Sequence, residues 1–436
     1  MAEDRRVERD LKHLVVPEAG RLEETGAQWE PYRLLDGDDL VIAPVAVYFA
    51  ELLAAHRSLA TLRSYGNDLL RWWRFLVAVG VPWDRAVRAD ARDFIRWMQV
   101  ADKPVRTHWR YRDRGSSAPV ARAVRRGPPP GSVNPVTGKA TPGRKYSPAT
   151  RAHAETVLRS FYDFQLEEGR GPVINPFPLD RGRRAGRAHA HHNPLDTFQP
   201  VRRGRYRPAV VRRAPRRIPD EQFNELFSKL RYLRDCALLA FWISTGARTV
   251  ELLSALQRDA VPGDQLISVT RKGSGDVQQL PASPDAFVWL RLYQQEAWRQ
   301  GVPRGRAAPL WWTLRRPWRP LTYDAARAMF RRVAALLGAN WTLYDLRHTA
   351  AYRMARDPQL PLTDVQWILG HRRLTTTQLY VPPGEEEMIA SLLAYFARRD
   401  RPLLPEAGQQ VLVPEAGQQV LVYDPESLDI LFGGAL

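Results

Sequence analysis

Hydrophobic residues recur at helical spacing in the first half of the chain. From Ser58 to Gly80 they fall on one face of a helix, because apolar side chains return every three or four positions. Ser58 is suited to cap the start of this helix, and Gly80 is suited to end it. The residues predicted on the buried face are Leu62, Tyr65, Leu69, Trp73 and Leu76.

Two further stretches in this half of the chain predict helices. Residues 90–99 form a short apolar-periodic stretch, and a longer one begins with Ser147 and Pro148 and ends at Gly169. Together with the first helix they predict a small all-helical domain over residues 45–180. Its aromatic residues are expected in the core rather than on a binding surface.

After Pro219 the pattern changes to longer helices around one hairpin. Residues 231–246 are nearly all apolar, which predicts a buried helix closed by its final glycine. Two short runs on either side of residues 273–275 predict a β-hairpin. Three more helices are expected at 284–300, 322–337 and 342–356. The predicted fold is mainly α: an all-helical core-binding domain and a mostly helical catalytic domain with a small antiparallel β-sheet.

The positive charge of the chain is concentrated in two segments. The net charge is +18, and residues 104–145 hold ten lysines and arginines against one acid, while residues 181–217 hold twelve arginines against one acid. Both segments are rich in proline and glycine, which predicts extended loops or linkers. Trp109, Tyr111 and Tyr206 stand among these arginines, as is typical of arms that neutralise nucleic-acid phosphates. A solvated charge run and an arginine-rich genome are the plainer alternatives.

The composition also excludes several classes of protein. Cys236 is the only cysteine, so no disulfide can form within the chain, and a cysteine zinc site is not predicted. No apolar run approaches the roughly 18 residues of a membrane span. The N-terminus "MAEDRRVERD" is too charged for a signal peptide. We therefore expect a cytoplasmic protein that does not enter a membrane.

Residues suited to phosphate chemistry follow the predicted buried helix. Arg248 comes at the expected start of the next helix, where backbone N–H groups favour an anion. Lys272 lies at the tip of the predicted hairpin and is the only lysine after Lys229, which argues against a passive surface charge. Tyr344 and Arg347 stand three positions apart on one face of a predicted helix.

His371 and Tyr380 lie in the stretch "LGHRRLTTTQLY". Gly370 is predicted to end one helix and Thr375 or a neighbour to cap the next, so that a short helix delivers Tyr380 to a phosphate held near His371. Two arginines, a lysine, a histidine and a tyrosine are the groups needed for phosphoryl transfer without a metal. Arginine binds phosphate oxygens in bidentate fashion, tyrosine can act as nucleophile, and lysine can protonate the leaving oxygen.

The order "TGAR…RKG…LYDLRHT…LGHRRLTTTQLY" resembles the tyrosine recombinases, the phage integrase family, across residues 45–400. Each of these residues alone could have a purely structural role, such as a core aromatic or a surface charge, but their order and spacing match the family. The resemblance implies a site-specific recombinase, the integrase of a mobile element. It would act on attachment sites in double-stranded DNA as a homotetramer, through a 3′-phosphotyrosyl intermediate, with a directionality factor as a further partner.

The resemblance also implies a role for each candidate residue. Arg248 and Arg347 would clamp the phosphate, and Lys272 would be the general acid. His371 would bind the phosphate, and Tyr380 would be the nucleophile. These roles come from the resemblance rather than from spacing alone.

One position departs from the family pattern. The family usually has histidine three residues before the second arginine, where this chain has Tyr344. Tyrosine can hydrogen-bond a phosphate oxygen or the nucleophile, but it is a poor base near neutral pH, so the proton acceptor stays open. The alternatives are a topoisomerase or telomere-resolving relative with the same chemistry, and a DNA-binding regulator that has lost catalysis.

The chain is expected to divide into five parts, and no metal or cofactor is assigned. The histidines at 189, 191 and 192 lie in an arginine-rich linker and are expected to be solvated. "PEAGQQVLV" occurs twice in tandem in an acidic, apolar C-terminal tail, which is expected to pack on a neighbouring subunit. The predicted parts are an N-terminal extension (1–44), the helical core-binding domain (45–180, with the basic insertion 104–145), the basic linker (181–217), the catalytic domain (218–400) and the tail (401–436).

Overall fold

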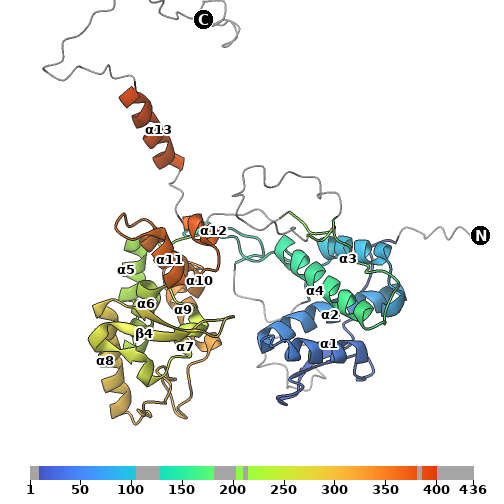
Figure 1. Cartoon of the computed structure of the whole chain (residues 1–436), viewed down its shortest axis with the longest axis horizontal. Helices are drawn as coiled ribbons and strands as arrows, with labels where there is room; N and C mark the ends of the chain where they lie inside the picture. The colour runs from blue at the N-terminus through green and yellow to red at the C-terminus, as the bar shows by residue number, and fades with distance from the viewer. Residues whose placement is uncertain (1–8, 105–127, 181–202, 210–214, 381–384, 400–436) are drawn as a thin grey trace, which may run out of the picture. The chain divides into compact units, whose positions relative to one another are not determined.

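The computed structural model describes residues 9–104, 128–180, 203–209, 215–380 and 385–399 (Figure 1). The histidine cluster, the C-terminal tail and much of both basic segments lie outside these residues. By its contacts the chain divides into two units, residues 1–350 and 351–436. The boundaries of the five predicted parts stay predictions.

The first unit begins with a helical part that carries a small sheet. Its helices form where the sequence supplies caps and apolar periodicity. Its elements are β1 (Arg21–Glu24), β2 (Tyr32–Leu35), α1 (Ala43–Ala54), α2 (Leu59–Val79), the short 3-10 helix η1 (Trp83–Arg85), α3 (Arg88–Val100) and α4 (Pro148–Glu167).

The remainder of the first unit is mostly helical and surrounds a three-stranded sheet. Its elements are α5 (Asp220–Ser228), α6 (Leu233–Thr245), α7 (Thr249–Leu253), η4 (Gln257–Asp259), β3 (Ala260–Val261), η5 (Pro262–Asp264), β4 (Leu266–Thr270), β5 (Val277–Pro281), α8 (Pro284–Arg299), α9 (Tyr323–Leu336) and α10 (Leu343–Ala355), whose last turn belongs to the second unit. The second unit continues with α11 (Leu362–Leu369), α12 (Leu374–Thr377), η6 (Gln378–Tyr380) and α13 (Glu385–Arg399).

The predicted caps of the two long N-terminal helices are confirmed. The Ser58 hydroxyl accepts a hydrogen bond from the N–H of Thr61 at 3.2 Å, and Gly80 ends α2 in the left-handed conformation. Ser147 caps α4 in the same way, accepting from the N–H of Thr150 at 3.2 Å. Local side-chain chemistry therefore sets both helix starts.

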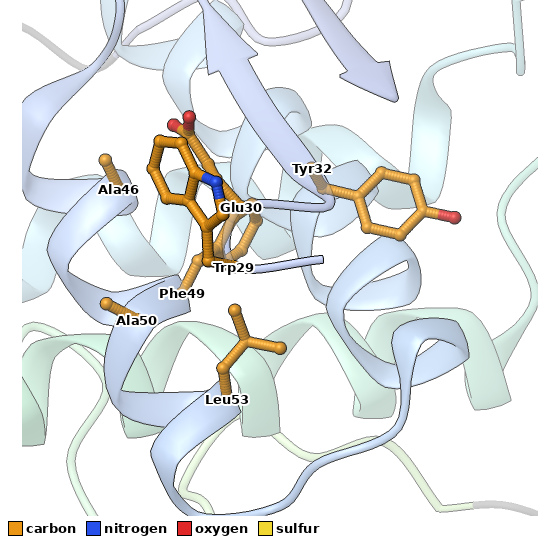
Figure 2. Close-up of a pocket in the computed structure, with 7 residues that line it drawn as sticks. All are labelled: Trp29, Glu30, Tyr32, Ala46, Phe49, Ala50 and Leu53. Atoms are coloured by element: carbon orange, nitrogen blue, oxygen red, sulfur yellow. The ribbon is translucent and has the colours of Figure 1, made fainter. Parts of the chain in front are cut away.

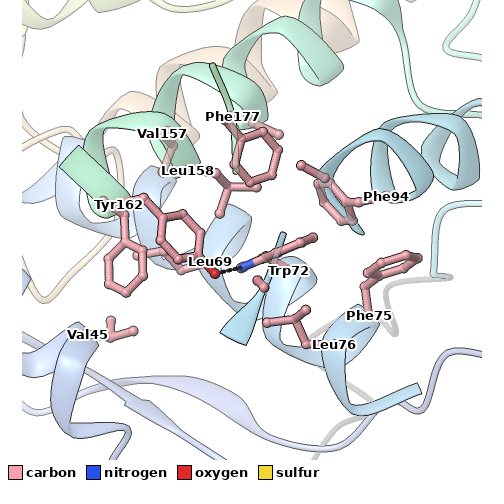
Figure 3. Packing of buried hydrophobic residues seen from close by; sticks show 14 of the residues in the cluster. Val45, Leu69, Trp72, Phe75, Leu76, Phe94, Val157, Leu158, Tyr162 and Phe177 are labelled. Atoms are coloured by element: carbon pink, nitrogen blue, oxygen red, sulfur yellow. Dashed lines mark hydrogen bonds between the residues drawn. The ribbon is translucent and has the colours of Figure 1, made fainter. Parts of the chain in front are cut away.

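The core of the helical part is aromatic, as predicted; Leu62, Leu69 and Leu76 of the predicted face are buried, but Tyr65 is only partly buried. Trp72 is fully buried, whereas the predicted Trp73 packs only partly buried against the same core. Figure 3 shows Trp72 among Phe75, Phe94 and Phe177, with its indole N–H donating to the hydroxyl of Tyr162 at 2.9 Å. Trp72 is the better core residue because its ring packs against Phe94 of α3, Tyr162 of α4 and Phe177.

The two-stranded sheet β1–β2 was not predicted. It is antiparallel, and Leu34 of β2 lies in the helical core. Strand β1 approaches α2 so closely that a Cβ added to Gly66 would lie 2.6 Å from a methyl carbon of Leu22. A larger residue at position 66 would therefore have to displace the side chain of Leu22.

The predicted buried helix and hairpin are both present in the second half of the first unit. The residues of α6 are almost all buried, and Gly246 closes the helix with a φ of 60°. Strands β4 and β5 pair antiparallel, and the short strand β3 extends the sheet on the free side of β4. None of the described helices is long and apolar enough to cross a membrane.

The hydroxyl of Tyr162 supports a testable prediction about the helical core. This buried hydroxyl accepts from Trp72 and donates to the carbonyl of Trp83, each at 2.9 Å. Tyr162→Phe should lower the free energy of unfolding by about 1–3 kcal/mol, because the indole N–H loses its buried acceptor. Urea unfolding followed by circular dichroism measures the change. Tyr65→Phe, at a half-buried ring, is the control, and an equal loss in both variants would contradict the assignment.

Candidate active site

One buried carboxylate organises a cluster of cationic residues. Glu251, in α7, is 1% exposed. Its Oε1 accepts from Arg248 Nη1 at 2.8 Å and from the backbone N–H of Lys272 at 3.1 Å. Its Oε2 accepts from the backbone N–H of Arg248 and from Arg271 Nη1, each at 3.0 Å. One side chain therefore ties the start of α7 to the tip of the β4–β5 hairpin.

The protonation of Glu251 follows from these contacts. Burial alone would raise the pKa of this carboxyl, but the hydrogen bonds from Lys272 and Arg248 and the charge of Arg248 hold it below its usual value. Glu251 is therefore ionised at neutral pH and neutralises part of the local positive charge.

The same contacts correct one expectation from the sequence. The backbone N–H of Arg248 was expected to face an anion, but it donates to Glu251. Helix α7 has only five residues, and its first turn is closed from within by this capping interaction. An anion would be held by the guanidinium of Arg248, whose side chain is 31% exposed, and not by the helix start.

The hairpin tip holds Lys272 at the surface. Arg271 is 6% exposed and donates from Nε to Gln278 Oε1 at 2.6 Å as well as to Glu251, whereas Lys272 is exposed. Gly273 and Gly275 complete the turn with φ values of 106° and 79°, which other residues rarely adopt. The buried arginine anchors the turn, and the lysine beside it is presented to solvent.

Helix α10 brings a second arginine to the loop that precedes Arg248. Arg347 is 5% exposed, and its Nη1 donates to the carbonyl of Gly246 at 2.6 Å. Gly246 is two residues before Arg248, so both candidate arginines are anchored at the same turn after α6. The structure therefore brings Arg248, Arg347 and the hairpin of Lys272 together.

Asp345 fixes the start of α10. It is 4% exposed, and its Oδ2 accepts from the N–H of Thr342 at 2.7 Å and from the Thr342 hydroxyl at 2.9 Å. Its Oδ1 lies 3.4 Å from Arg216 Nη2, in the last part of the predicted linker. Two residues further along, the N–H of Ile218 donates to the hydroxyl of Thr349 at 2.8 Å. The end of the linker is therefore attached to α10.

Tyr344 is at the surface of the first unit, and its neighbour is an uncharged histidine. Tyr344 is 62% exposed, and its ring meets His348 edge to face at a centroid distance of 4.3 Å. Burial, with a contribution from the charge of Arg347, lowers the pKa of His348 to about 4. At neutral pH His348 is therefore a neutral imidazole.

The second unit holds the other two candidate residues. The His371 and Tyr380 rings lie nearly parallel, with centroids 6.3 Å apart, and His371 Nδ1 lies 2.9 Å from the hydroxyl of Thr377. Gly370 ends α11 in the left-handed conformation, as predicted. The predicted cap at Thr375 is wrong: α12 begins after Arg373 without a side-chain cap.

Tyr380 is packed in the core of the second unit. It is 6% exposed and belongs to a cluster with Ala351, Val365 and Leu369. Its backbone lies in the 3-10 turn η6 that follows the four residues of α12. The short connection predicted between His371 and Tyr380 is therefore built from a helical turn and a 3-10 turn.

Residues 216–387 match the phage integrase family. This segment, less than half of the chain, is similar to the tyrosine recombinases of that family. All six candidate residues fall within the matched segment. The family and the mainly α fold predicted from the sequence are both confirmed.

Curated relatives cover more of the chain than this segment. The tyrosine recombinase XerD of Lacticaseibacillus casei is 25% identical over 252 residues, which are 56% of this chain and 75% of that protein. The tyrosine recombinase XerC of Roseiflexus sp. (strain RS-1) is 27% identical over 245 residues, 54% of this chain and 69% of that protein.

A solved structure shares the fold. The Tn1549 transposon integrase in complex with circular intermediate DNA aligns with a TM-score of 0.50 at 16% identity, covering 80% of this chain and 98% of that chain. At this identity the likeness concerns the fold alone.

Several residues of the site were missed from the sequence. Glu251 carried a signal, because an acid three residues after a helix start is the pattern of a capping box. Nothing in the sequence distinguishes Arg271 and Asp345 from other charged residues, because their importance comes from burial in the folded chain.

A pocket elsewhere in the helical part is unrelated to this chemistry. Figure 2 shows Trp29 over apolar side chains of α1; the residues that line the pocket are Trp29, Glu30, Tyr32, Ala46, Phe49, Ala50 and Leu53. In the described part of the chain, no three histidine, cysteine, aspartate or glutamate residues lie together as a metal site would require.

Replacement of Glu251 tests its organising role. Glu251→Gln should lower the free energy of unfolding by about 3–5 kcal/mol, because buried Arg271 loses its counter-charge. The loss of unfolding free energy relative to the parent protein should have its full size at pH values above the usual glutamate pKa. It should shrink as pH falls through the lowered pKa of Glu251. Chemical denaturation at a series of pH values measures this.

The matched control is Glu225→Gln, at an exposed position of α5. This variant should differ little from the parent protein. Equal stabilities for the Glu251 and Glu225 variants would show that the Glu251 carboxylate is not needed to hold the cluster.

Proposed function

We propose that this chain is a site-specific DNA recombinase that breaks and rejoins DNA strands through a 3′-phosphotyrosyl intermediate. The observation that carries the proposal is the arrangement around Glu251, which holds Arg248 and the hairpin of Lys272 together inside the family segment. With Arg347 anchored at the same loop, this cluster offers fixed cations to a phosphate and its developing negative charge.

The proposed reaction assigns one role to each candidate residue. The phenol oxygen of Tyr380 attacks the phosphorus, a bond forms between them, and the bond to the 5′ oxygen breaks. Lys272 gives a proton to that leaving oxygen. In the second step the 5′ hydroxyl of another strand attacks the phosphotyrosine, which releases Tyr380 without ATP.

The remaining roles concern binding of the phosphate. Arg248 and Arg347 hold the non-bridging oxygens, and His371 hydrogen-bonds one of them. Tyr344 donates a hydrogen bond in the place where the family usually has histidine. No metal or cofactor is part of this proposal.

We propose double-stranded DNA and further copies of this chain as partners, from the charge of the basic segments and the exposed apolar surface of α13. The basic segments 104–145 and 181–217 would neutralise phosphates of double-stranded DNA at attachment sites. A homotetramer on DNA is supported by α13, which exposes an apolar face that a monomer would leave in water. The residues of that face are Ile389, Leu392, Leu393, Tyr395 and Phe396. A mobile-element origin, a directionality factor, a cytoplasmic location and trans contacts of residues 401–436 complete the proposal.

Tyr380→Phe provides the direct test of this function. The variant lacks only the attacking oxygen, so it should bind DNA with nearly unchanged affinity while forming no covalent protein–DNA adduct. Suicide DNA substrates that trap the adduct on a denaturing gel measure the reaction, and gel shift measures the affinity. An adduct with the Phe variant would show that another residue attacks.

The parent protein is the positive control in this test. If it also forms no adduct on any cognate DNA, the chain is a DNA-binding regulator, the alternative that the departure at Tyr344 leaves open. If it forms adducts and relaxes supercoiled plasmids without site preference, it acts as a topoisomerase.

Tyr344 gives a second prediction. Tyr344→Phe should slow adduct formation by roughly tenfold to a thousandfold, because one hydrogen bond to the transition state is lost. Tyr344→His should be as fast as the parent or faster, since imidazole adds a base near neutral pH. Single-turnover cleavage at saturating DNA separates these effects from binding. A Phe variant that cleaves at the parent rate would remove the hydroxyl from the mechanism.

A further inference from the structure

A small hairpin at the end of the basic insertion is held by its own hydrogen bonds. The N–H of Thr141 donates to the carbonyl of Ser132 at 2.8 Å, and the N–H of Asn134 donates to the carbonyl of Lys139 at 3.0 Å. The side chain of Asn134 accepts from the N–H of Thr137 at 2.9 Å, which closes the turn. We call residues 132–141 the insertion hairpin.

The insertion hairpin docks on the turn between α9 and α10, some two hundred residues later in the chain. The side-chain N–H of Asn134 donates to the carbonyl of Gly338 at 2.7 Å. The hydroxyl of Thr137 donates to Asn340 Oδ1, and Asn340 Nδ2 donates to the carbonyl of Lys139 at 3.1 Å. Asn340 therefore both accepts a hydrogen bond from the hairpin and donates one to it. This two-way pairing makes the docking contact specific.

The docked hairpin brings a lysine to the start of α10. The side chain of Lys139 is half-buried and lies within electrostatic range of Asp345 and Arg216. Burial lowers the pKa of this ammonium, while the charge of Asp345 acts against that shift. The linker and the insertion hairpin thus each bring one cation to Asp345.

Asp345 is an unfavourable residue to place beside a phosphate. It lies between Tyr344 and Arg347 in the sequence and is 4% exposed, so little water screens its charge. An uncompensated carboxylate there would repel an anion bound by Arg347. It is nevertheless needed, because it caps the helix that carries both residues.

We propose that the insertion hairpin is a latch on α10 and that Lys139 is a positioning residue of the active site. Docked through Asn340, it would place the Lys139 charge where it offsets Asp345, so that the start of α10 receives a phosphate without repulsion. This inference rests on the proposed function. It also makes the basic insertion more than a flexible phosphate-binding arm.

The first experiment is a double-mutant cycle read by adduct formation at saturating suicide substrate. Lys139→Ala should lower the single-turnover rate by about tenfold or more, and Lys139→Arg should restore most of it. In an Asp345→Asn background, which keeps an acceptor for the helix cap, Lys139→Ala should lower the single-turnover rate by less than about threefold. Such coupling is not expected from a lysine that only attracts DNA.

Arg144→Ala is the matched control, because it removes the same charge from the same segment without touching the docking contact. Its effect should be the same with Asp345 and with Asn at that position. Equal losses from Lys139→Ala in both backgrounds, or no loss at saturating DNA, would overturn the positioning role.

A second experiment tests the latch without catalysis, so that it stands apart from the proposed function. In the full-length protein without DNA, Asn340→Ala removes two of the three docking hydrogen bonds. Amide hydrogen exchange of residues 132–141 should then be faster by about tenfold, while exchange in α4 stays unchanged. Unchanged exchange in the insertion hairpin would show that it does not dock on α10 in solution.

Discussion

The ion pair between Glu251 and the arginines around it is the interaction on which the rest of the candidate site depends. A carboxylate with 1% exposure has lost its water, and its ionised form is stable only because four donors replace that water. Three of those donors belong to Arg248 and Arg271, and the fourth is the backbone N–H of Lys272. Loss of any one partner would leave a buried charge or donor unsatisfied, so the cluster forms as a whole. A preorganised set of cations is what phosphoryl transfer requires, because the site then need not rearrange as charge develops.

Asp345 holds the start of α10 in a different way. Glu251 is fully ligated within its cluster, whereas Asp345 is shared between a helix cap at Thr342 and a longer contact with Arg216 at 3.4 Å. The first arrangement makes a rigid hairpin and loop, while the second joins α10 to segments distant in the chain. Arg347 depends on Asp345, which caps the start of its helix at Thr342, and on Gly246, whose carbonyl anchors its guanidinium.

The sequence predicted those features that are set locally. Helices α2 and α4 were found because Ser58 and Ser147 cap them and apolar residues follow at helical spacing. The choice of Trp73 over Trp72 failed because periodicity defines a face only to within one residue, and the packing of α3 and α4 decides which side chain is enclosed.

The features set by distant contacts were not predicted. Strand β1 pairs with β2 and lies against α2, and nothing in its four residues signals either partner. The candidate residues were recognised by their order in the family pattern, yet the distances between them do not follow from that order. Hairpin docking at Asn340 is a contact across two hundred positions, which no local pattern encodes.

The side chains of α10 also bear on how Tyr380, if it is the nucleophile as proposed, would lose its proton. A tyrosine phenol has a pKa of about 10, so attack near neutral pH needs a base or nearby cations that stabilise the phenolate. In α10, Tyr344 is itself a phenol, and His348 has a pKa lowered to about 4 by burial, so neither is an efficient base at pH 7. What the described residues of the first unit supply instead is positive charge, from Arg248, Arg347 and Lys272. For the proposed mechanism, these side chains favour stabilisation of a phenolate by cations, with the proton passing to solvent or to the phosphate, over general-base catalysis from α10.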